Sequence, residues 1–267
     1  MVSCPIDPAG TPARKHWRDT LKDDAIKTLL PAGRLRIFEA SAGRGELARE
    51  LAALGHAVTV SNFRLLGGLG VGEVEADLNA KLPLPDAAFD AVICREVIEH
   101  LESVPHTLRE FNRILSPGGL LVLTFPNRLH IRSRLLHLFT GFYRGLRSPI
   151  NLDVPFGEAH INLVGYPEMD YFLRKTGFAP GEVLASHVQA SDFAFLILRP
   201  LVRLATWYFL LCSRPRAEEH DKTRPENRRY NRHIARTLLS VPVFLGKGLI
   251  VSAVKSPHAD SAQAIPD

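Results

Sequence analysis

The turn Glu39-Ala40-Ser41-Ala42-Gly43-Arg44-Gly45 limits the folds open to this chain more than any other stretch. The apolar run 35–38 before it is typical of a buried strand, and in 46–54 after it apolar residues recur at helical spacing. Gly43 and Gly45 allow positive φ angles and leave room for a ligand beside the backbone. The first N–H groups of the helix have no partner within the helix, so they are available to that ligand. The sequence therefore predicts a strand–turn–helix unit that holds a small molecule, most simply a nucleotide-like cofactor.

Apolar strands and helical stretches alternate along the rest of the chain. We expect strands over 57–60, 71–76, 89–94, 120–125, 182–188 and 248–254, and helices over 15–30, 105–115 and 166–175. Such alternation predicts a mainly parallel sheet with helices on both faces. The predicted fold class is α/β, a Rossmann-like seven-stranded mainly parallel sheet flanked by helices, with a helical insertion before the last strand.

Polar residues stand where the predicted parallel strands end. They are Glu39, Ser61, Asn62, Asp77, Arg95, Glu96 and Asn127. In parallel α/β sheets the ligand lies at the carboxyl ends of the strands, so these residues form the predicted site.

The predicted domain organisation has three parts. Residues 1–188 form the core, and within it 128–164 is too long for a plain connection and is expected to be a lid or substrate wall. Residues 189–244 form a helical, partly amphipathic insertion, and 245–267 hold the last strand and a tail.

The apolar stretch 193–212 resembles a membrane span in length, but it contains Arg199, Pro200 and Arg203. Two arginines in the middle of a span are costly, so we expect an amphipathic helix instead. Such a helix lies in a membrane interface or covers an apolar substrate pocket. An ordinary core-facing helix is the alternative.

Composition indicates the cellular compartment and the kind of surface expected for the protein. Apolar residues make up 46% of the chain. The net charge is +5, and a solvated basic surface is a simpler interpretation of this charge than a surface that binds nucleic acid. The three cysteines form no C-x-x-C pair, which fits a reduced compartment, and 1–11 lack the apolar core of a signal peptide. We expect a cytoplasmic protein, with peripheral membrane contact through 190–212 as a further hypothesis.

The order of four motifs resembles the class I S-adenosylmethionine-dependent methyltransferases. The turn matches the family's acid-x-Gly-x-Gly-x-Gly motif, with Ser41 in place of the first glycine. The other three matches are 83–92 with 96–101, 115–119 with 124–127, and 160–163 before a helix that ends at Lys175-Thr176-Gly177-Phe178. The resemblance covers about 30–188 and the last strand, and it implies methyl transfer from S-adenosylmethionine.

The resemblance also implies which residues hold this cofactor. They are Glu39, Ser41, Gly43, Gly45, Asn62, Asp77, Leu78 and Arg95. Glu39 is expected to receive the cofactor's ammonium group or to stabilise the turn, and Asp77 to accept from the adenine amino group. The family usually places an acid after the second strand for the ribose hydroxyls, where this chain has Ser61-Asn62. The amide of Asn62 can both donate and accept, but without a charge-assisted bond, so we expect modest affinity.

A carboxylate–histidine cluster follows the 89–94 strand. Helical spacing would place Glu96, Glu99 and His100 on one face. With His160 they resemble the metal ligands of small-RNA 2′-O-methyltransferases and of some ubiquinone-pathway O-methyltransferases, so we predict a Mg²⁺ site as a subsidiary hypothesis. The alternative is that the acids favour the helix dipole and that His100 only packs. His160 is the first choice for the catalytic base and His100 the second, because imidazole titrates near neutral pH.

We therefore predict a methyltransferase that O-methylates a hydroxyl of a small, lipid-linked or glycan acceptor. A first rival is an NAD-binding oxidoreductase or epimerase, because 43–48 also match G-x-G-x-x-A. The missing acid after the second strand argues against it. A second rival is a membrane-associated binding protein with a decayed cofactor site. RNA is the rival acceptor, which the absence of a basic-aromatic stripe makes less favoured.

Overall fold

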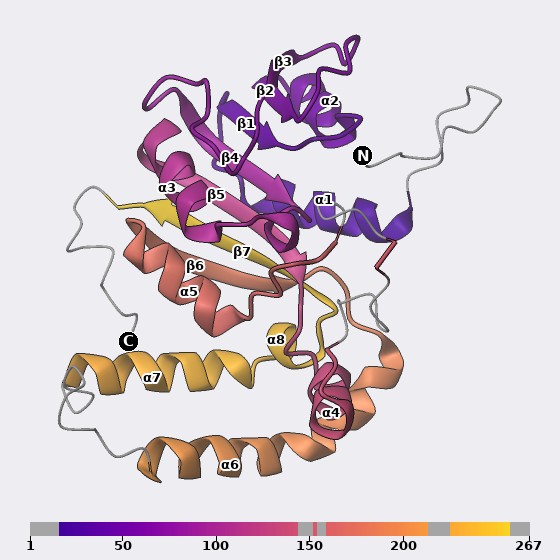
Figure 1. Cartoon of the computed structure of the whole chain (residues 1–267), viewed down its shortest axis with the longest axis vertical. Coiled ribbons are helices and arrows are strands. Elements are labelled where there is room, and N and C mark those ends of the chain that lie inside the picture. Colours follow the sequence, from indigo (N-terminus) through magenta and orange to yellow (C-terminus); the bar gives the residue numbers. More distant parts are fainter. Residues whose placement is uncertain (1–15, 144–151, 154–158, 213–224, 257–267) are drawn as a thin grey trace.

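A computed structural model of the protein describes residues 16–143, 152–153, 159–212 and 225–256 (Figure 1). Its centre is a seven-stranded sheet with the strand order β3-β2-β1-β4-β5-β7-β6. The strands are β1 (Arg36–Ala40), β2 (Ala57–Asn62), β3 (Gly72–Glu75), β4 (Phe89–Arg95), β5 (Leu115–Pro126), β6 (Phe178–Ala185) and β7 (Gly248–Lys255). The first five are parallel, and β7 runs antiparallel to β5 and β6. The predicted Rossmann-like fold is confirmed.

Helices cover both faces of this sheet. The helical elements of the described ranges are α1 (Trp17–Leu29), α2 (Glu46–Ala53), the 3-10 turn η1 (Ile98–His100), α3 (Val104–Ile114), α4 (Ile131–Thr140), α5 (Tyr166–Lys175), the 3-10 segment η3 (Ala190–Leu198), α6 (Arg199–Cys212), α7 (Pro225–Leu238) and α8 (Val241–Leu245). Along β4, Val92 and Cys94 belong to the core under α3 and α5, whereas Ala91 and Ile93 belong to the core under α1 and α2. Successive strand residues point to opposite faces, so a strand covered on both sides must be apolar throughout.

Some element boundaries differ from the predicted ones. β5 begins at Leu115 rather than 120, because Leu115 already pairs with Phe89 at the start of β4, before a register shift after which Leu120 pairs with Ala91. Gly119 permits the irregular backbone of this stretch, since a Cβ there would lie 2.8 Å from the Ser116 carbonyl oxygen and 3.2 Å from the Asp90 carbonyl oxygen of β4. β6 begins at Phe178 rather than 182, because Phe178 pairs with Lys255 at the far end of β7. Part of the predicted lid, the arm before residue 16 and the tail after 256 lie outside the described residues.

Between β6 and β7, the described residues form the 3-10 segment η3 and the helices α6, α7 and α8. α6 and α7 lie side by side on the outside of the molecule, below the sheet in Figure 1. No residue of α6 is buried, so the alternative of an ordinary core-facing helix is wrong for this segment. By length and composition, Ala190–Cys212 could cross a membrane, alone among the helices of the described ranges.

Candidate active site

The glycine turn after β1 is held by the end of β2. The Asn62 amide accepts a hydrogen bond from the Gly43 N–H (2.8 Å) and donates one to the Gly43 carbonyl (3.1 Å). The Ser61 hydroxyl accepts from the Ser41 N–H at 3.1 Å. Asn62 is buried and its amide is already engaged, so the structure assigns it to shaping the turn rather than to the ribose diol expected from the sequence.

The turn itself requires left-handed backbone. Gly43 and Gly45 have φ angles of +56° and +64°, and Ser41 has a φ of +53° although it carries a Cβ. Gly45 is the N-cap of α2, so the first N–H groups of that helix lie beside the turn; among them, the Ala48 N–H binds the Glu39 carboxylate. A Cβ on Gly43 would meet no atom within 4 Å, so the turn borders open space. Backbone N–H groups beside open space are what a cofactor cradle requires.

Glu39 lies under the turn in a buried three-residue ion cluster. Arg95 donates through Nε to the Glu39 carboxylate at 2.9 Å and through Nη1 to Asp23 of α1 at 2.6 Å. Burial raises the pKa of Glu39 above its ordinary value, although the charge of Arg95 acts in the opposite direction. Burial works against a charged Arg95, but the carboxylates of Glu39 and Asp23 outweigh it and raise the pKa of Arg95. The cluster ties α1 to the ends of β1 and β4.

Asp23 and Glu73, which are not among the residues predicted from the sequence, both occupy defined positions at the site. The Glu73 carboxylate accepts from the N–H groups of Leu66 and Gly67 and from the Asn62 amide. The hydrogen bond from Leu66 contributes most to lowering the pKa of Glu73. A carboxylate therefore does lie beside the end of β2, but it comes from β3, where Glu73 is the register partner of Val60. Only strand pairing reveals this, because nothing in the local sequence marks Glu73.

Asp77 and Leu78 follow β3 at the edge of the sheet. Asp77 is exposed and its carboxylate accepts from the N–H of Asn79 at 2.9 Å, which closes a turn. Leu78 is buried, and its carbonyl accepts from the Thr107 hydroxyl at 2.8 Å. Asp77 stays a predicted adenine contact, because its carboxylate faces outward where β3 ends.

The carboxylate–histidine cluster after β4 differs from the predicted helical arrangement. Glu96 lies before η1 with a φ of +52°, so Glu96, Glu99 and His100 do not share a helix face. Glu96 instead accepts from the Thr124 hydroxyl at 3.0 Å and lies 3.6 Å from the Lys22 ammonium. Glu96, a metal ligand in the prediction from the sequence, is therefore not part of the group whose ligand atoms converge. Glu99, His100 and His160 do converge, with their ligand atoms within 4.8 Å of one another.

The electrostatics of this cluster are unusual. Burial, and then the negative charge of Glu96, raise the pKa of Glu99 to about 8. The Oε2 atom of Glu99 is buried and has no hydrogen-bond partner in the described part of the chain. The rings of His100 and His160 meet edge to face with centroids 4.8 Å apart. A buried carboxyl with an open oxygen beside two imidazoles can hold a cation or exchange a proton.

His160 also lines a pocket of about 390 Å³. The pocket has a charged end with Arg128 and Glu168, and apolar walls that include Val164 and Phe172. Asn127, which follows β5 and belongs to the site predicted from the sequence, is not among the residues that line this pocket. Its buried amide donates to the carbonyls of Val243 and Gly246 at 2.8 and 2.7 Å and so joins β5 to α8.

Comparisons with known proteins agree on one family. A family profile described as "Methyltransferase domain" matches residues 14–183. A probable S-adenosylmethionine-dependent methyltransferase of Mycolicibacterium smegmatis is 33% identical over 39% of this chain, and the match spans only 34% of that relative. A ubiquinone biosynthesis O-methyltransferase of Xanthomonas oryzae is 28% identical over 58% of this chain and 74% of its own length.

Solved structures match the fold at low sequence identity. An S-adenosylmethionine-dependent methyltransferase from Archaeoglobus fulgidus superposes with a TM-score of 0.55 and 15% identity, over 89% of this chain and 94% of that one. Phosphoethanolamine N-methyltransferase 2 of Haemonchus contortus, in complex with S-adenosyl-L-methionine, gives a TM-score of 0.52 and 17% identity, over 89% of this chain and 52% of that one.

Proposed function

Since the chain belongs to the class I S-adenosylmethionine-dependent methyltransferases, we propose that it transfers the methyl group to a hydroxyl of a small, lipid-linked or glycan acceptor. The main observation in support of this proposal is the position of His160, which contacts His100 and lines the 390 Å³ pocket. A hydroxyl must lose its proton as it attacks, and an imidazole beside an acceptor-sized pocket is suited to receive it. The name of the Xanthomonas relative, an O-methyltransferase, supports oxygen as the acceptor atom.

S-adenosylmethionine supplies a methyl group on a sulfonium, and the glycine turn at the end of β1 fits such a group because it borders open space. The backbone N–H groups at the start of α2 and the turn shaped by Asn62 would bind it there. The acceptor oxygen forms a bond to the methyl carbon as the carbon–sulfur bond breaks. The residues of this chain mainly orient the two partners.

The proton of the acceptor hydroxyl passes to an imidazole in this proposal. His100 Nδ1 lies 3.1 Å from the Ala159 carbonyl oxygen, which only accepts, so Nδ1 carries the proton of neutral His100. His100 Nε2 is then the basic nitrogen of that ring. His160 is the proposed base, and His100 is proposed to position it through their edge-to-face contact.

A divalent ion is a second proposal for the same cluster. The open buried Oε2 of Glu99 and the convergence with His100 and His160 fit a cation. Two imidazoles and one carboxylate suit Mn²⁺, Fe²⁺ or Zn²⁺ better than Mg²⁺, which prefers an all-oxygen shell. The Mg²⁺ expected from the sequence therefore does not fit these ligands. When bound, such an ion lowers the pKa of a coordinated hydroxyl.

The test combines calorimetry with product analysis. Calorimetry of the purified protein should show binding of S-adenosylmethionine and S-adenosylhomocysteine, and none of NAD. S-adenosylhomocysteine release with a panel of phenols, sugars and prenyl alcohols should identify a hydroxyl acceptor, whereas methylation only of amines would refute the O-methylation proposal. His160→Asn should lower kcat by about 10²- to 10⁴-fold and leave cofactor binding unchanged.

A further inference from the structure

Helix α6 presents an apolar face to the outside of the molecule. Leu201, Leu204, Tyr208 and Leu211 recur at spacings of three and four, so they lie on one side of the helix. Each of these four side chains is between 60% and 65% exposed. We call these four residues the α6 apolar face. Soluble proteins rarely leave such a contiguous face uncovered, so a partner surface is expected.

The start of α6 is fixed to the body of the protein, which gives this face a defined orientation. Val202 and Leu198 pack against the cluster formed by α4 and α8. Asp192 of η3 accepts from Arg132 of α4 at 2.6 Å and lies 3.1 Å from His130. The face therefore belongs to a docked helix and not to a detached segment.

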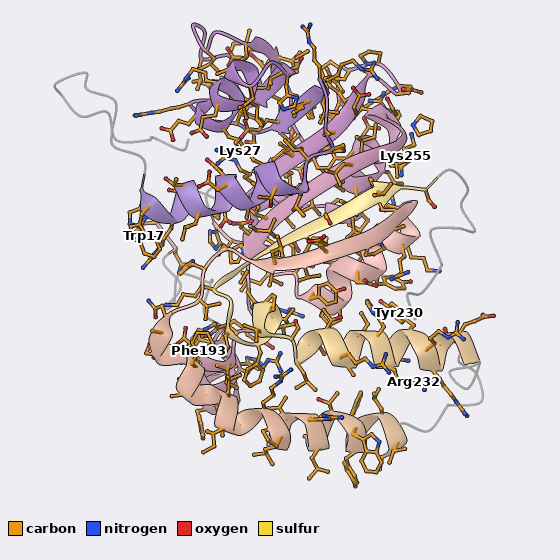
Figure 2. The ribbon with its side chains drawn as sticks, turned by 180° about the vertical axis from the view of Figure 1, so that it is seen from behind. Trp17, Lys27, Phe193, Tyr230, Arg232 and Lys255 are labelled. Carbon is orange, nitrogen blue, oxygen red and sulfur yellow. The ribbon has the colours of Figure 1, made fainter. Side chains whose placement is uncertain are left out.

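An arginine-lined groove runs between α6 and α7, next to the apolar face. The groove has a volume of about 780 Å³, and Arg199 and Arg203 of α6 line it together with Arg232 and Arg236 of α7. Among the described residues, no acidic side chain lines the groove, and none of the four arginines forms an ion pair there. Figure 2 shows Arg232 on the α6 side of α7, whereas Tyr230 lies toward the sheet. Arginine can place its aliphatic stem along apolar surface and its guanidinium in the headgroup layer.

The topology argues against a membrane crossing by this segment. β6 ends at Ala185 and β7 begins at Gly248, and the two strands pair in the same sheet. A single crossing by Ala190–Cys212 would oblige the chain to cross back before β7. The return helix α7 carries Arg228, Arg229, Arg232 and Arg236, which makes a second crossing too costly. A helix that lies along the surface satisfies both constraints.

We propose that α6 docks onto the surface of a membrane that contains anionic lipids. The α6 apolar face enters the boundary between headgroups and acyl chains, and Arg199, Arg203, Arg232 and Arg236 bind the lipid phosphates. The unpaired positive charge of the groove complements a negative surface and not a basic or neutral one. This proposal does not depend on the identity of the methyl acceptor.

The experiment is co-sedimentation of the full-length protein with phosphatidylcholine vesicles, with and without phosphatidylglycerol. We expect binding to the anionic vesicles that falls as salt is added. The double variant Arg203→Gln/Arg232→Gln should weaken partitioning by about five-fold for each arginine removed. Leu204→Glu/Tyr208→Glu should abolish it, because it places charge in the apolar boundary.

Matched controls separate the surface from general effects. Leu54→Glu, at the C-cap of α2, and Arg109→Gln, on α3, change exposed residues away from this surface and should leave binding unchanged. Absence of binding by the intact protein, or equal binding to neutral vesicles, would overturn the proposal. Sedimentation velocity without lipid is the second arm: a dimer that Leu204→Glu/Tyr208→Glu dissociates would mean that a second copy covers this face, which would also overturn it.

Discussion

The side chain of Asn62 and the backbone of Gly43 hydrogen-bond to each other in both directions, at 2.8 Å from the Gly43 N–H and at 3.1 Å to its carbonyl. The same amide donates to Glu73 at 3.1 Å, so β2, β3 and the glycine turn meet at one buried side chain. Asn62 is therefore a support of the cofactor turn.

Asn62→Ala should lower the free energy of unfolding by about 3 kcal/mol, because it removes three side-chain hydrogen bonds that contribute about 1 kcal/mol each. Urea denaturation measures this, and calorimetry should show weaker S-adenosylmethionine binding because the turn is no longer held. Asn62→Asp keeps the shape but loses the donor that faces Gly43 and Glu73, so it should be at least as harmful. Loss of cofactor affinity with unchanged stability would instead indicate a direct ribose contact.

Ser41→Gly should stabilise the protein by about 0.5–1 kcal/mol. Ser41 has a φ of +53°, which is strained for a residue with a Cβ, and the relief exceeds the extra entropy of glycine in the unfolded chain. Thermal and urea unfolding measure the change. Ser103→Gly is the control, since Ser103 has a φ of −133° and the same substitution there should not stabilise. A destabilised Ser41→Gly protein would contradict the strain argument.

Arg95→Met should lower the free energy of unfolding by about 3–5 kcal/mol, because it leaves the buried carboxylates of Glu39 and Asp23 without their cation. The loss should depend on pH. Glu39 has a folded pKa above its ordinary 4.5, so the folded state holds the proton more tightly and stability falls as pH rises from 4.5 through the folded pKa. Without Arg95 that pKa rises further, which widens the window.

Urea denaturation at pH 5 and pH 8 tests this sign, with a greater loss expected at pH 8. Arg109→Met, an exposed arginine on α3, is the matched control and should change stability by less than about 0.5 kcal/mol. A loss that is larger at pH 5 would show that the carboxylates are not the cause.

Mn²⁺ or Zn²⁺ should raise the melting temperature of the wild-type protein, and Mg²⁺ should do so less. At a concentration one hundred times Kd the ion adds about 2.7 kcal/mol, which corresponds to roughly 5–10 °C for a chain of this size. Glu99→Gln should remove most of the shift, because Glu99 contributes the only carboxylate of the converging group. Glu102→Gln, an exposed neighbour, should keep it. An equal shift in Glu99→Gln would place the ion elsewhere.

The local sequence was sufficient to predict the central strands and the glycine turn of this protein. The apolar runs that became β1, β4 and β7, the turn with Gly43 and Gly45, and the helix that follows can each be found from periodicity and glycine placement. These features depend on neighbours in the chain, because a buried strand must be apolar on both faces and a tight turn needs positive φ. The order of the motifs then identified the methyltransferase family, which the comparisons confirm.

Contacts between residues distant in sequence decided what the site residues do. Asn62 bonds to Gly43, 19 residues away, and Arg95 joins Asp23 and Glu39, 72 and 56 residues away. Glu96 leaves the predicted cluster because its backbone turns to a φ of +52° and Thr124 binds its carboxylate. A polar side chain can satisfy its hydrogen bonds with a ligand or with the protein, and the sequence does not say which. Strand register and helix docking place the competing partner, so only the tertiary structure separates the residues that support the cofactor turn from those open to a ligand.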